Sequence, residues 1–268
     1  MRTVSPSPQP QECRVYKAVI FDIGGVVMRS PFIAIAAYEQ NLGLPIDYIN
    51  TSIVGYGSQG AWQKFERGEI DILDFYPAFG RELSDTVHGN RCYRKYCERK
   101  GIPCPQLPET LAVNGRELFG AMMHASQTYD PYIREAILRI RAAGKHRVIA
   151  LTNNFAKIDV PAAELNFLGW GEGVIPDHLR DLFDDFCDSS ALGMRKPEPE
   201  FYLVACRRNK IKPTEAIFLD DIGLNLKAAK ALGMDTILVQ IGKTLEAVKE
   251  LERRIEMKLI DSKSDAKL

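Results

Sequence analysis

The chain has 268 residues, 46% of them hydrophobic, which is enough apolar material for one large domain or for a core with an inserted lobe. Its 35 Lys and Arg residues balance 35 Asp and Glu residues, so net charge gives no reason to expect nucleic acid or a membrane surface as a partner. No stretch approaches the roughly 20 apolar residues that span a bilayer, and no N-terminal segment has the flanks of a secretory signal.

The first predicted element follows an unstructured leader. Residues 1–14 hold three prolines among Ser and Gln residues and are predicted to be disordered. Tyr16–Phe21 is a compact apolar run that ends at Asp22 and the Gly24-Gly25 pair. This order is typical of a buried strand that delivers a carboxylate into a tight turn.

Residues 30–128 contain amphipathic helical stretches and no credible strand, so they are predicted to be a mostly helical cap inserted after the first strand. The expected helices are Phe32–Asn41, Trp62–Arg67 and Asp71–Leu83. We expect this cap to set substrate specificity. Most of its aromatic residues should fill the cap's own core, because aromatic stripes at helical spacing usually do, and the remainder could line an apolar pocket. These residues are Phe32, Tyr38, Tyr56, Trp62, Phe65, Phe75, Tyr76 and Phe79.

Two polar patterns in the same region have plain structural explanations. A basic run is predicted to be a solvated helix face; it consists of Arg91, Arg94, Lys95, Arg99 and Lys100. Cys92, Cys97 and Cys104 cluster, but their spacing lacks the close pairing of structural zinc sites. We therefore expect reduced thiols in this cluster.

Three further apolar runs are predicted to be strands, and two of them end at polar residues. His146–Leu151 leads into Thr152-Asn153-Asn154, and Ala216–Leu219 leads into Asp220-Asp221. The last run, Thr236–Val239, ends in a looser polar stretch.

Helical patterns separate these runs: Tyr132–Ala143, Glu198–Asn209 and Asn225–Leu232, the last closed by Gly233 as a C-terminal cap. Alternating strands and helices of this length predict a doubly wound α/β domain, with a Rossmann-like parallel sheet covered by helices on both faces. Sites in such sheets lie at the carboxyl ends of the strands. The polar residues that follow the strands are therefore predicted to converge.

Residues 244–268 are predicted to form a charged helix followed by a tail. The last three residues, Ala266-Lys267-Leu268, are a variant of the Ser-Lys-Leu peroxisomal address. If the source is eukaryotic, we expect a peroxisomal import receptor as a partner; otherwise we expect a cytoplasmic location. The complete predicted division is a leader at 1–14, an α/β core at 15–29 and 129–243, a cap at 30–128, and a C-terminal helix and tail at 244–268.

Four segments carry the functional prediction, and their order and spacing matter as much as their residues. They are FDIGGVV at 21–27, LTNN at 151–154, GMRKPEPEFY at 193–202 and FLDDIGLNLKAA at 218–229. Together they resemble the four signature motifs of the haloacid-dehalogenase-like superfamily. Within it, the chain looks most similar to the phosphatase-like N-terminal domain of soluble epoxide hydrolases and the related domain of an acyl-CoA dehydrogenase family.

The residues make chemical sense in these roles. Asp22 is the candidate nucleophile, because a positioned carboxylate needs no general base before it attacks a phosphoryl or alkyl centre. Thr152 and Asn153 would offer donors to the oxygens of the transferred group. Lys196 would add a positive charge to the same oxygens and hold Asp22 ionised. Asp22, Thr152 and Lys196 are the predicted catalytic residues, and Thr152, Asn153 and Lys196 the predicted phosphate-binding residues.

The resemblance implies a Mg²⁺ cofactor held by Asp22, the backbone carbonyl of Gly24, and Asp221. Magnesium would cancel the repulsion between a carboxylate nucleophile and an anionic phosphate ester. Asp220 and Asn225 resemble the residues that orient Asp221 and Lys196 from behind. The implied activity is that of a magnesium-dependent phosphatase acting on a small phosphorylated metabolite through an aspartyl-phosphate on Asp22.

One position departs from the phosphatase pattern. Related phosphatases carry a second Asp two residues after the nucleophile, which protonates the leaving alcohol and activates water, whereas this chain has Gly24 there. Losing a positioned acid and base costs typically about 10²- to 10⁴-fold in rate. A water or a cap residue could take over this role; the candidate side chains are Glu66, Asp85, His88 and His124. Two other functions stay open at this stage: a metal-free dehalogenase, because halide leaves without protonation, and a weakly active binding or regulatory module.

Overall fold

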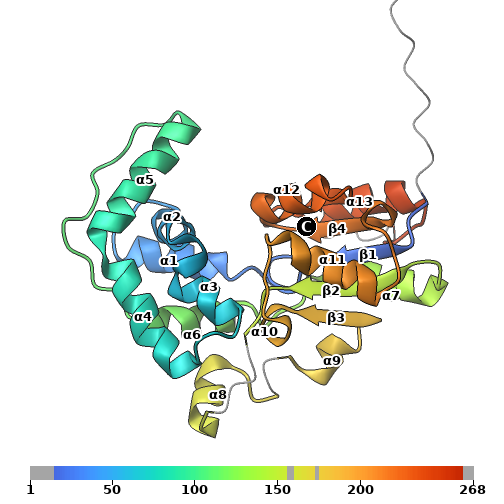
Figure 1. Ribbon diagram of the computed structural model, residues 1–268, viewed down its shortest axis with the longest axis horizontal. Helices are drawn as coiled ribbons and strands as arrows, with labels where there is room; N and C mark the ends of the chain where they lie inside the picture. Colours follow the sequence, from blue (N-terminus) through green and yellow to red (C-terminus); the bar gives the residue numbers. More distant parts are fainter. Residues whose placement is uncertain (1–14, 156–159, 173–174, 262–268) are drawn as a thin grey trace, which may run out of the picture.

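The computed structural model describes residues 15–155, 160–172 and 175–261 (Figure 1). Its centre is a five-stranded sheet in the order β3-β2-β1-β4-β5, with every neighbouring pair parallel. The strands are β1 (Ala18–Phe21), β2 (Arg147–Thr152), β3 (Asp185–Asp188), β4 (Ala216–Asp220) and β5 (Asp235–Leu238). This arrangement confirms the predicted doubly wound α/β fold.

The central strands β1, β2 and β4 are mostly apolar because both faces of the sheet are covered. In β1, Val19 and Phe21 pack in one hydrophobic cluster and Ala18 and Ile20 in another, as expected from side chains that alternate between faces. All four are fully buried. A continuous apolar run of this kind is what identifies a buried parallel strand in the sequence.

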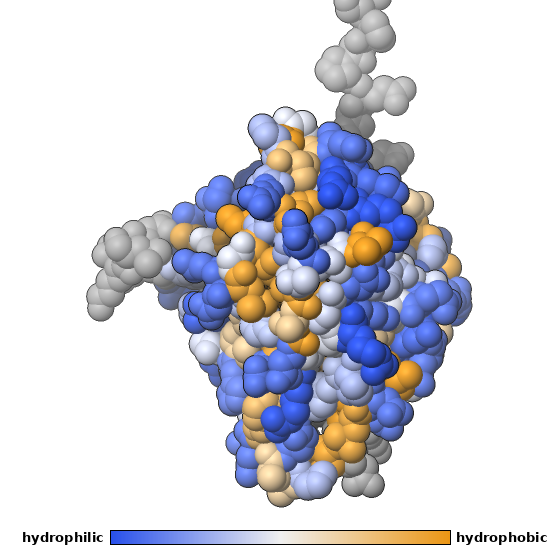
Figure 2. All heavy atoms as spheres, turned by 90° about the vertical axis from the view of Figure 1, so that its left-hand side faces the viewer, coloured by the Kyte–Doolittle hydropathy of each residue, from blue (hydrophilic) through white to orange (hydrophobic). Residues whose placement is uncertain are grey.

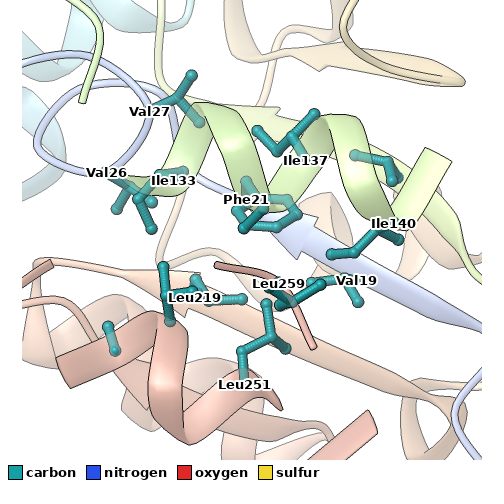
Figure 3. Close-up of a cluster of buried hydrophobic side chains, with 14 of the residues drawn as sticks. Val19, Phe21, Val26, Val27, Ile133, Ile137, Ile140, Leu219, Leu251 and Leu259 are labelled. Carbon is teal, nitrogen blue, oxygen red and sulfur yellow. The ribbon is translucent and has the colours of Figure 1, made fainter. Parts of the chain in front are cut away.

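Two pairs of helices cover the two faces. The helices α7 (Pro131–Ala143) and α13 (Thr244–Ile255) pack on the face of Val19 and Phe21, where Ile133, Ile137 and Leu251 meet the strands (Figure 3). The helices α11 (Pro199–Arg208) and α12 (Gly223–Ala231) contribute to the opposite cluster. Shorter helical elements connect the layers: α9 (Asp177–Arg180), α10 (Ser189–Leu192) and η2 (Pro213–Glu215).

A helical segment lies beside the sheet (Figure 1). It consists of α1 (Phe32–Asn41), α2 (Tyr48–Gly55), η1 (Gly57–Gln59), α3 (Ala61–Glu66), α4 (Ile72–Ser84), α5 (Thr86–Lys100) and α6 (Gly115–Ala125). Residues 30–128 contain no strand, as predicted. The helix α8 (Ala162–Leu168), which comes after β2, packs against α6, and Leu168 and Trp170 join the hydrophobic cluster of this segment. The division into core and cap stays a prediction, and α8, which lies in the predicted core range, contacts the predicted cap.

The expectation that aromatic residues fill the core of the helical segment is confirmed for four of them. Phe65, Phe75, Tyr76 and Phe79 are at most 6% exposed. The other four are only partly buried but pack against the same cluster or stack within the segment; they are Phe32, Tyr38, Tyr56 and Trp62. The aromatic residues therefore serve mainly to hold the segment together.

The surface of the helical segment is mixed. All five residues of the basic run on α5 are exposed, which confirms a solvated helix face. Ile46, Val54, Leu73 and Val87 are exposed as well, and Figure 2, which looks onto this end of the molecule, shows hydrophobic side chains among the hydrophilic ones.

The structure adds elements that the sequence did not predict, chiefly β3, α2, α6 and α8. Among the described residues, none of the helices combines the length and apolarity that crossing a bilayer requires. The predicted leader at 1–14 and the Ala266-Lys267-Leu268 signal lie outside the described residues.

Candidate active site at the carboxyl ends of the strands

The sheet places two carboxylates side by side. Phe21 of β1 pairs with Leu219 of β4, and the Asp22 N–H donates to the Leu219 carbonyl at 2.9 Å. The next residues along both strands are Asp22 and Asp220, whose side chains point to the same side because parallel neighbours share a face. Asp22 is 6% exposed and Asp220 is fully buried. The predicted convergence of these two residues is therefore a direct result of strand register.

Lys196 joins the two carboxylates. Its Nζ lies 2.7 Å from Asp22 Oδ1 and 2.8 Å from Asp220 Oδ2, and its side chain is 1% exposed. Asp220 also accepts hydrogen bonds from Asn225 Nδ2, at 3.1 Å to each oxygen, and from the Ile222 N–H at 2.7 Å. Asn225 therefore acts on Lys196 through Asp220, whose two oxygens are fully occupied by donors.

The loop after β2 is tied to the loop that carries Lys196. Asn153 Nδ2 donates to the Lys196 carbonyl at 3.1 Å, and the Lys196 N–H donates to Asn153 Oδ1 at 2.8 Å. Thr152 is 4% exposed, and its hydroxyl contacts the Asn153 carbonyl at 3.3 Å. The Asn153 amide therefore holds two loops together in this structure, and the Thr152 hydroxyl, with only one long contact, is the freer donor.

Asp221 differs from Asp220 because its carboxylate is largely unpaired. Among the described residues, Asp221 Oδ1 is buried without a hydrogen-bond partner, and Oδ2 contacts only the Ser30 hydroxyl, at 3.4 Å. The carboxylate packs directly over Gly25, where a Cβ would lie 2.0 Å from Oδ2. Gly25 also has a φ of +83°, a conformation that L side chains rarely adopt. The second glycine of the pair is thus required by the position of Asp221.

Gly24 lies in the hydrogen-bonded turn that follows β1, and it has more space around it than Gly25. The Gly25 N–H donates to the Met28 carbonyl at 2.8 Å, and the Met28 N–H donates to the Ile23 carbonyl at 2.8 Å. A Cβ at Gly24 would meet only Pro31 Cδ, at 3.7 Å, an ordinary contact. A side chain is therefore sterically possible at Gly24 and excluded at Gly25.

Burial and charge act together on the ionisable groups. Burial raises the pKa of Asp22 well above its usual range; Lys196 lowers it, while Asp220 and Asp221 raise it further. Burial, with Asp220 beside it, raises the pKa of Asp221 to about 7. Burial lowers the pKa of Lys196, but the attraction of Asp22 and Asp220 outweighs this effect and the pKa is raised. Lys196 thus favours the ionised form of Asp22 while burial opposes it, and the role of Lys196 in holding Asp22 ionised stays a prediction.

The residues fit a divalent cation. One carboxylate oxygen each from Asp22, Asp220 and Asp221 lies within 4.8 Å of the others, and no other group of three or more His, Cys, Asp or Glu side chains in the described residues is arranged in this way. Three carboxylates and one ammonium group leave two negative charges in excess when all are ionised. Hard oxygen donors suit Mg²⁺. Because the oxygens of Asp220 are occupied, Asp22 and the unpaired Asp221 are the better ligands.

Of the four side chains considered as substitutes for the missing acid, three have structural roles inside the helical segment. His88 stacks on Tyr56, with ring centroids 3.7 Å apart; His124 Nε2 lies 2.7 Å from the Phe167 carbonyl; and Asp85 caps α5. Only Glu66 reaches the loop that carries Lys196, through Arg195 Nε at 2.6 Å. Burial raises the pKa of Glu66, and Arg195 opposes this shift.

Comparisons with known proteins agree with this geometry. A model of haloacid dehalogenase-like hydrolases matches residues 16–233. The fold and the strand-end carboxylates thus define a protein of the hydrolase class. The chain belongs to the haloacid dehalogenase-like hydrolase family.

Individual relatives cover the chain almost completely. It is 34% identical over 240 residues to acyl-CoA dehydrogenase family member 10 of Mus musculus, covering 89% of this chain and 19% of that protein. It is 30% identical over 247 residues to bifunctional epoxide hydrolase 2 of Sus scrofa, covering 92% of this chain and 40% of that protein. The chain therefore spans less than half the length of these two relatives. The predicted similarity to both groups is confirmed.

A solved structure shares the fold. The chain superimposes with a TM-score of 0.50 and 20% identity on a HAD family enzyme of Bacteroides thetaiotaomicron in complex with magnesium and inorganic phosphate, covering 85% of this chain and 96% of that one. This likeness supports the fold assignment.

Proposed function

We propose that the protein is a magnesium-dependent phosphatase of a small phosphorylated metabolite, with Asp22 as the nucleophile. The observation that carries this proposal is the buried cluster in which Lys196 contacts Asp22 and Asp220 while Asp221 keeps an unpaired oxygen. In this proposal a carboxylate nucleophile, an ammonium group and a cation would surround one phosphoryl position.

The residues have distinct roles in this reaction. In the part of the chain that the structure describes, Lys196 Nζ and the Ile23 N–H both contact Asp22 Oδ1, so we assign the attack on phosphorus to Oδ2. The new Asp22–phosphorus bond forms as the bond to the leaving oxygen breaks, and the departing alkoxide takes a proton from water, because Gly24 supplies no acid. A water molecule then attacks the aspartyl-phosphate, which restores the Asp22 carboxylate and releases phosphate that carries the proton of this water. Lys196 and the Thr152 hydroxyl would stabilise the charge on the phosphoryl oxygens. Magnesium held by Asp22, Asp221 and the Gly24 carbonyl would supply neutralisation of that charge.

Relatives with phosphatase names support the proposal. The chain is 26% identical to sesquiterpene phosphatase astK of Aspergillus oryzae over 223 residues, covering 83% of this chain and 89% of that protein. It is also 26% identical over 237 residues to phosphoglycolate phosphatase of Nitrosospira multiformis, covering 84% of each chain. The names of these relatives refer to a sesquiterpene and to phosphoglycolate, which differ widely in polarity, so an apolar and a small polar substrate both stay within the proposal.

A panel of phosphorylated metabolites, assayed for phosphate release with Mg²⁺ and with a chelator, tests the proposal. We expect release from at least one ester that requires Mg²⁺ and is lost in the Asp22→Asn variant. The absence of the second Asp at Gly24 favours one other reaction, dehalogenation, because halide needs no proton when it leaves. Turnover of 2-haloacids in chelator, with no release of phosphate from any ester, would replace the phosphatase proposal.

A further inference from the structure

The C-terminal end of α3 docks on the loop that carries Lys196. Glu66 Oε2 lies 2.6 Å from Arg195 Nε, and the two side chains are only 6% and 16% exposed. The Glu66 carbonyl also accepts a hydrogen bond from the Ser189 hydroxyl at 2.6 Å. The helical segment is thus joined to residues 189–195 by a buried ion pair and a buried hydrogen bond.

The same turn of α3 reaches the loop after β2. Phe65 stacks on Phe155 with ring centroids 4.7 Å apart, and Trp62 packs edge-on against the same ring at 5.7 Å. Ser189, which donates to Glu66, accepts the Asn154 N–H at 2.9 Å. One short helix therefore contacts both loops that surround the phosphoryl position of the proposed reaction.

The contacts form a continuous path from Glu66 to the nucleophile. Glu66 holds Arg195, the next residue is Lys196, and Lys196 Nζ lies 2.7 Å from Asp22 Oδ1. The backbone of Lys196 is held from its other side by Asn153. Residue 196 is thus fixed by two flanking contacts, and one of them comes from the helical segment.

The contact between Glu66 and Arg195 is a buried ion pair, and such pairs fix geometry more than they add stability. Burying an ion pair removes two charges from water, so such a pair contributes little net stability compared with apolar residues of similar volume, whereas its geometry is specific. A carboxylate and a guanidinium fix both distance and direction. The Glu66–Arg195 ion pair, which lies directly before Lys196, is therefore better suited to holding the Lys196 loop in one position than to stabilising the fold.

We propose that Glu66 is a positioning residue that holds Lys196 against Asp22 through its ion pair with Arg195. The position of Lys196 therefore depends on the contact between α3 and the loop that carries Lys196. This inference rests on the proposed phosphatase function. In it Glu66 stays an anion, touches no substrate and transfers no proton. It thus has a different role from an acid that replaces the missing Asp at position 24.

Kinetics with two aryl phosphates test the proposal. The variants are Glu66→Gln, Arg195→Gln and the double variant, and the substrates are p-nitrophenyl phosphate and phenyl phosphate, whose leaving groups differ in their need for a proton. Displacement of a catalytic group by about 1 Å costs up to about 10²-fold, so we expect kcat to fall at least about tenfold on both substrates, with a smaller change in KM. The double variant should be no slower than the slower single variant, because both changes break the same contact.

Glu164→Gln is the matched control. Glu164 pairs with Arg116 at 2.8 Å, away from residues 189–196, and its side chain is 14% exposed. This variant should keep the kcat of the wild type. A loss in Glu66→Gln confined to phenyl phosphate would instead identify Glu66 as a proton donor and overturn the positioning role, as would wild-type rates in Glu66→Gln or additive losses in the double variant.

Hydrogen–deuterium exchange gives a readout that does not need turnover. The Lys196 N–H is protected by its bond to Asn153 Oδ1, so we expect faster exchange in peptides covering 193–198 in Glu66→Gln but not in Glu164→Gln. Unchanged exchange in those peptides, with the protein folded by thermal melting, would overturn the inference. If the wild type releases no phosphate from any ester, the proposed function fails, and the exchange experiment still decides whether Glu66 orders the loop.

Discussion

The strand-end site and the helical segment are both buried, but they are built from opposite materials. In the site, Asp22, Lys196 and Asp220 bring three charges within contact distance in a region that water barely reaches. In the helical segment, the centre is a set of stacked and edge-on rings around Phe75 and Phe119. Burial of charged groups in the site therefore destabilises the fold but provides the groups that the reaction needs, whereas the packed rings stabilise the helical segment.

This contrast predicts two kinds of failure. A substitution in the charged cluster should remove activity while leaving the fold intact, because relieving a buried excess of charge does not create a cavity. A substitution among the rings should lower the free energy of unfolding and affect catalysis only through the amount of folded protein.

Asp22→Asn should have the largest effect. Removing a catalytic nucleophile costs on the order of 10⁴-fold or more in kcat. Because burial raises the pKa of Asp22 in the folded, metal-free protein, the ionised group destabilises that state increasingly as pH rises from its unfolded to its folded pKa. The variant should therefore melt at the same or a higher temperature than wild type in chelator at neutral pH. A lower melting temperature with retained activity would contradict both expectations.

Phe75→Ala should have the largest effect on stability. Phe75 is fully buried and stacks on Phe65 and Phe79 with centroids 4.3 and 4.8 Å apart. Truncating a buried Phe to Ala costs about 3 to 5 kcal/mol, which urea titration would measure. Leu73→Ala on the same helix is the control, since Leu73 is 59% exposed and such surface changes stay within about 0.5 kcal/mol. Equal losses in the two variants would show that the ring cluster does not hold the segment together.

Gly25→Ala should disable the site by geometry alone. The new methyl would overlap Asp221 Oδ2 and force a positive φ on a residue with a side chain, so we expect about 10²-fold lower kcat from displacement of Asp221 by roughly 1 Å. Gly24→Ala is the matched control, because its Cβ meets only Pro31 at 3.7 Å. A Mg²⁺ titration of both variants should show weakened dependence only in Gly25→Ala, and equal behaviour would remove the assigned role of Asp221.

Gly24→Asp should have the smallest effect and the opposite sign. The position has room for a Cβ, and a positioned acid and base contributes typically 10²- to 10⁴-fold, so even partial placement should raise kcat by about tenfold. The gain should be greater for phenyl phosphate than for p-nitrophenyl phosphate, because the poorer leaving group needs the proton more. A uniform loss on both substrates would mean that the site has adapted to glycine at this position.

Much of the α/β fold could be predicted from local pattern. The apolar runs of β1, β2 and β4 predict buried strands, and the polar residues that follow these strands mark the site. The strand β3 was missed because Asp185 and Asp188 enclose its short apolar stretch, so that it does not look like a buried run. Inside the helical segment, the basic run predicts the solvated helix face of α5, but the bounds of that helix do not follow from the run, because its many polar residues obscure the apolar period.

The identity of the reacting groups follows from local sequence, since an apolar run followed by Asp22, or by Asp220 and Asp221, is a local signal that strand geometry converts into position. The pairing of these groups follows only from the packing of the folded chain. Asp220 is occupied and Asp221 is not, and Glu66 meets Arg195 from 129 positions away. Contacts of this kind depend on how separately formed elements pack, and packing is set by the sum of many distant interactions that no local periodicity records.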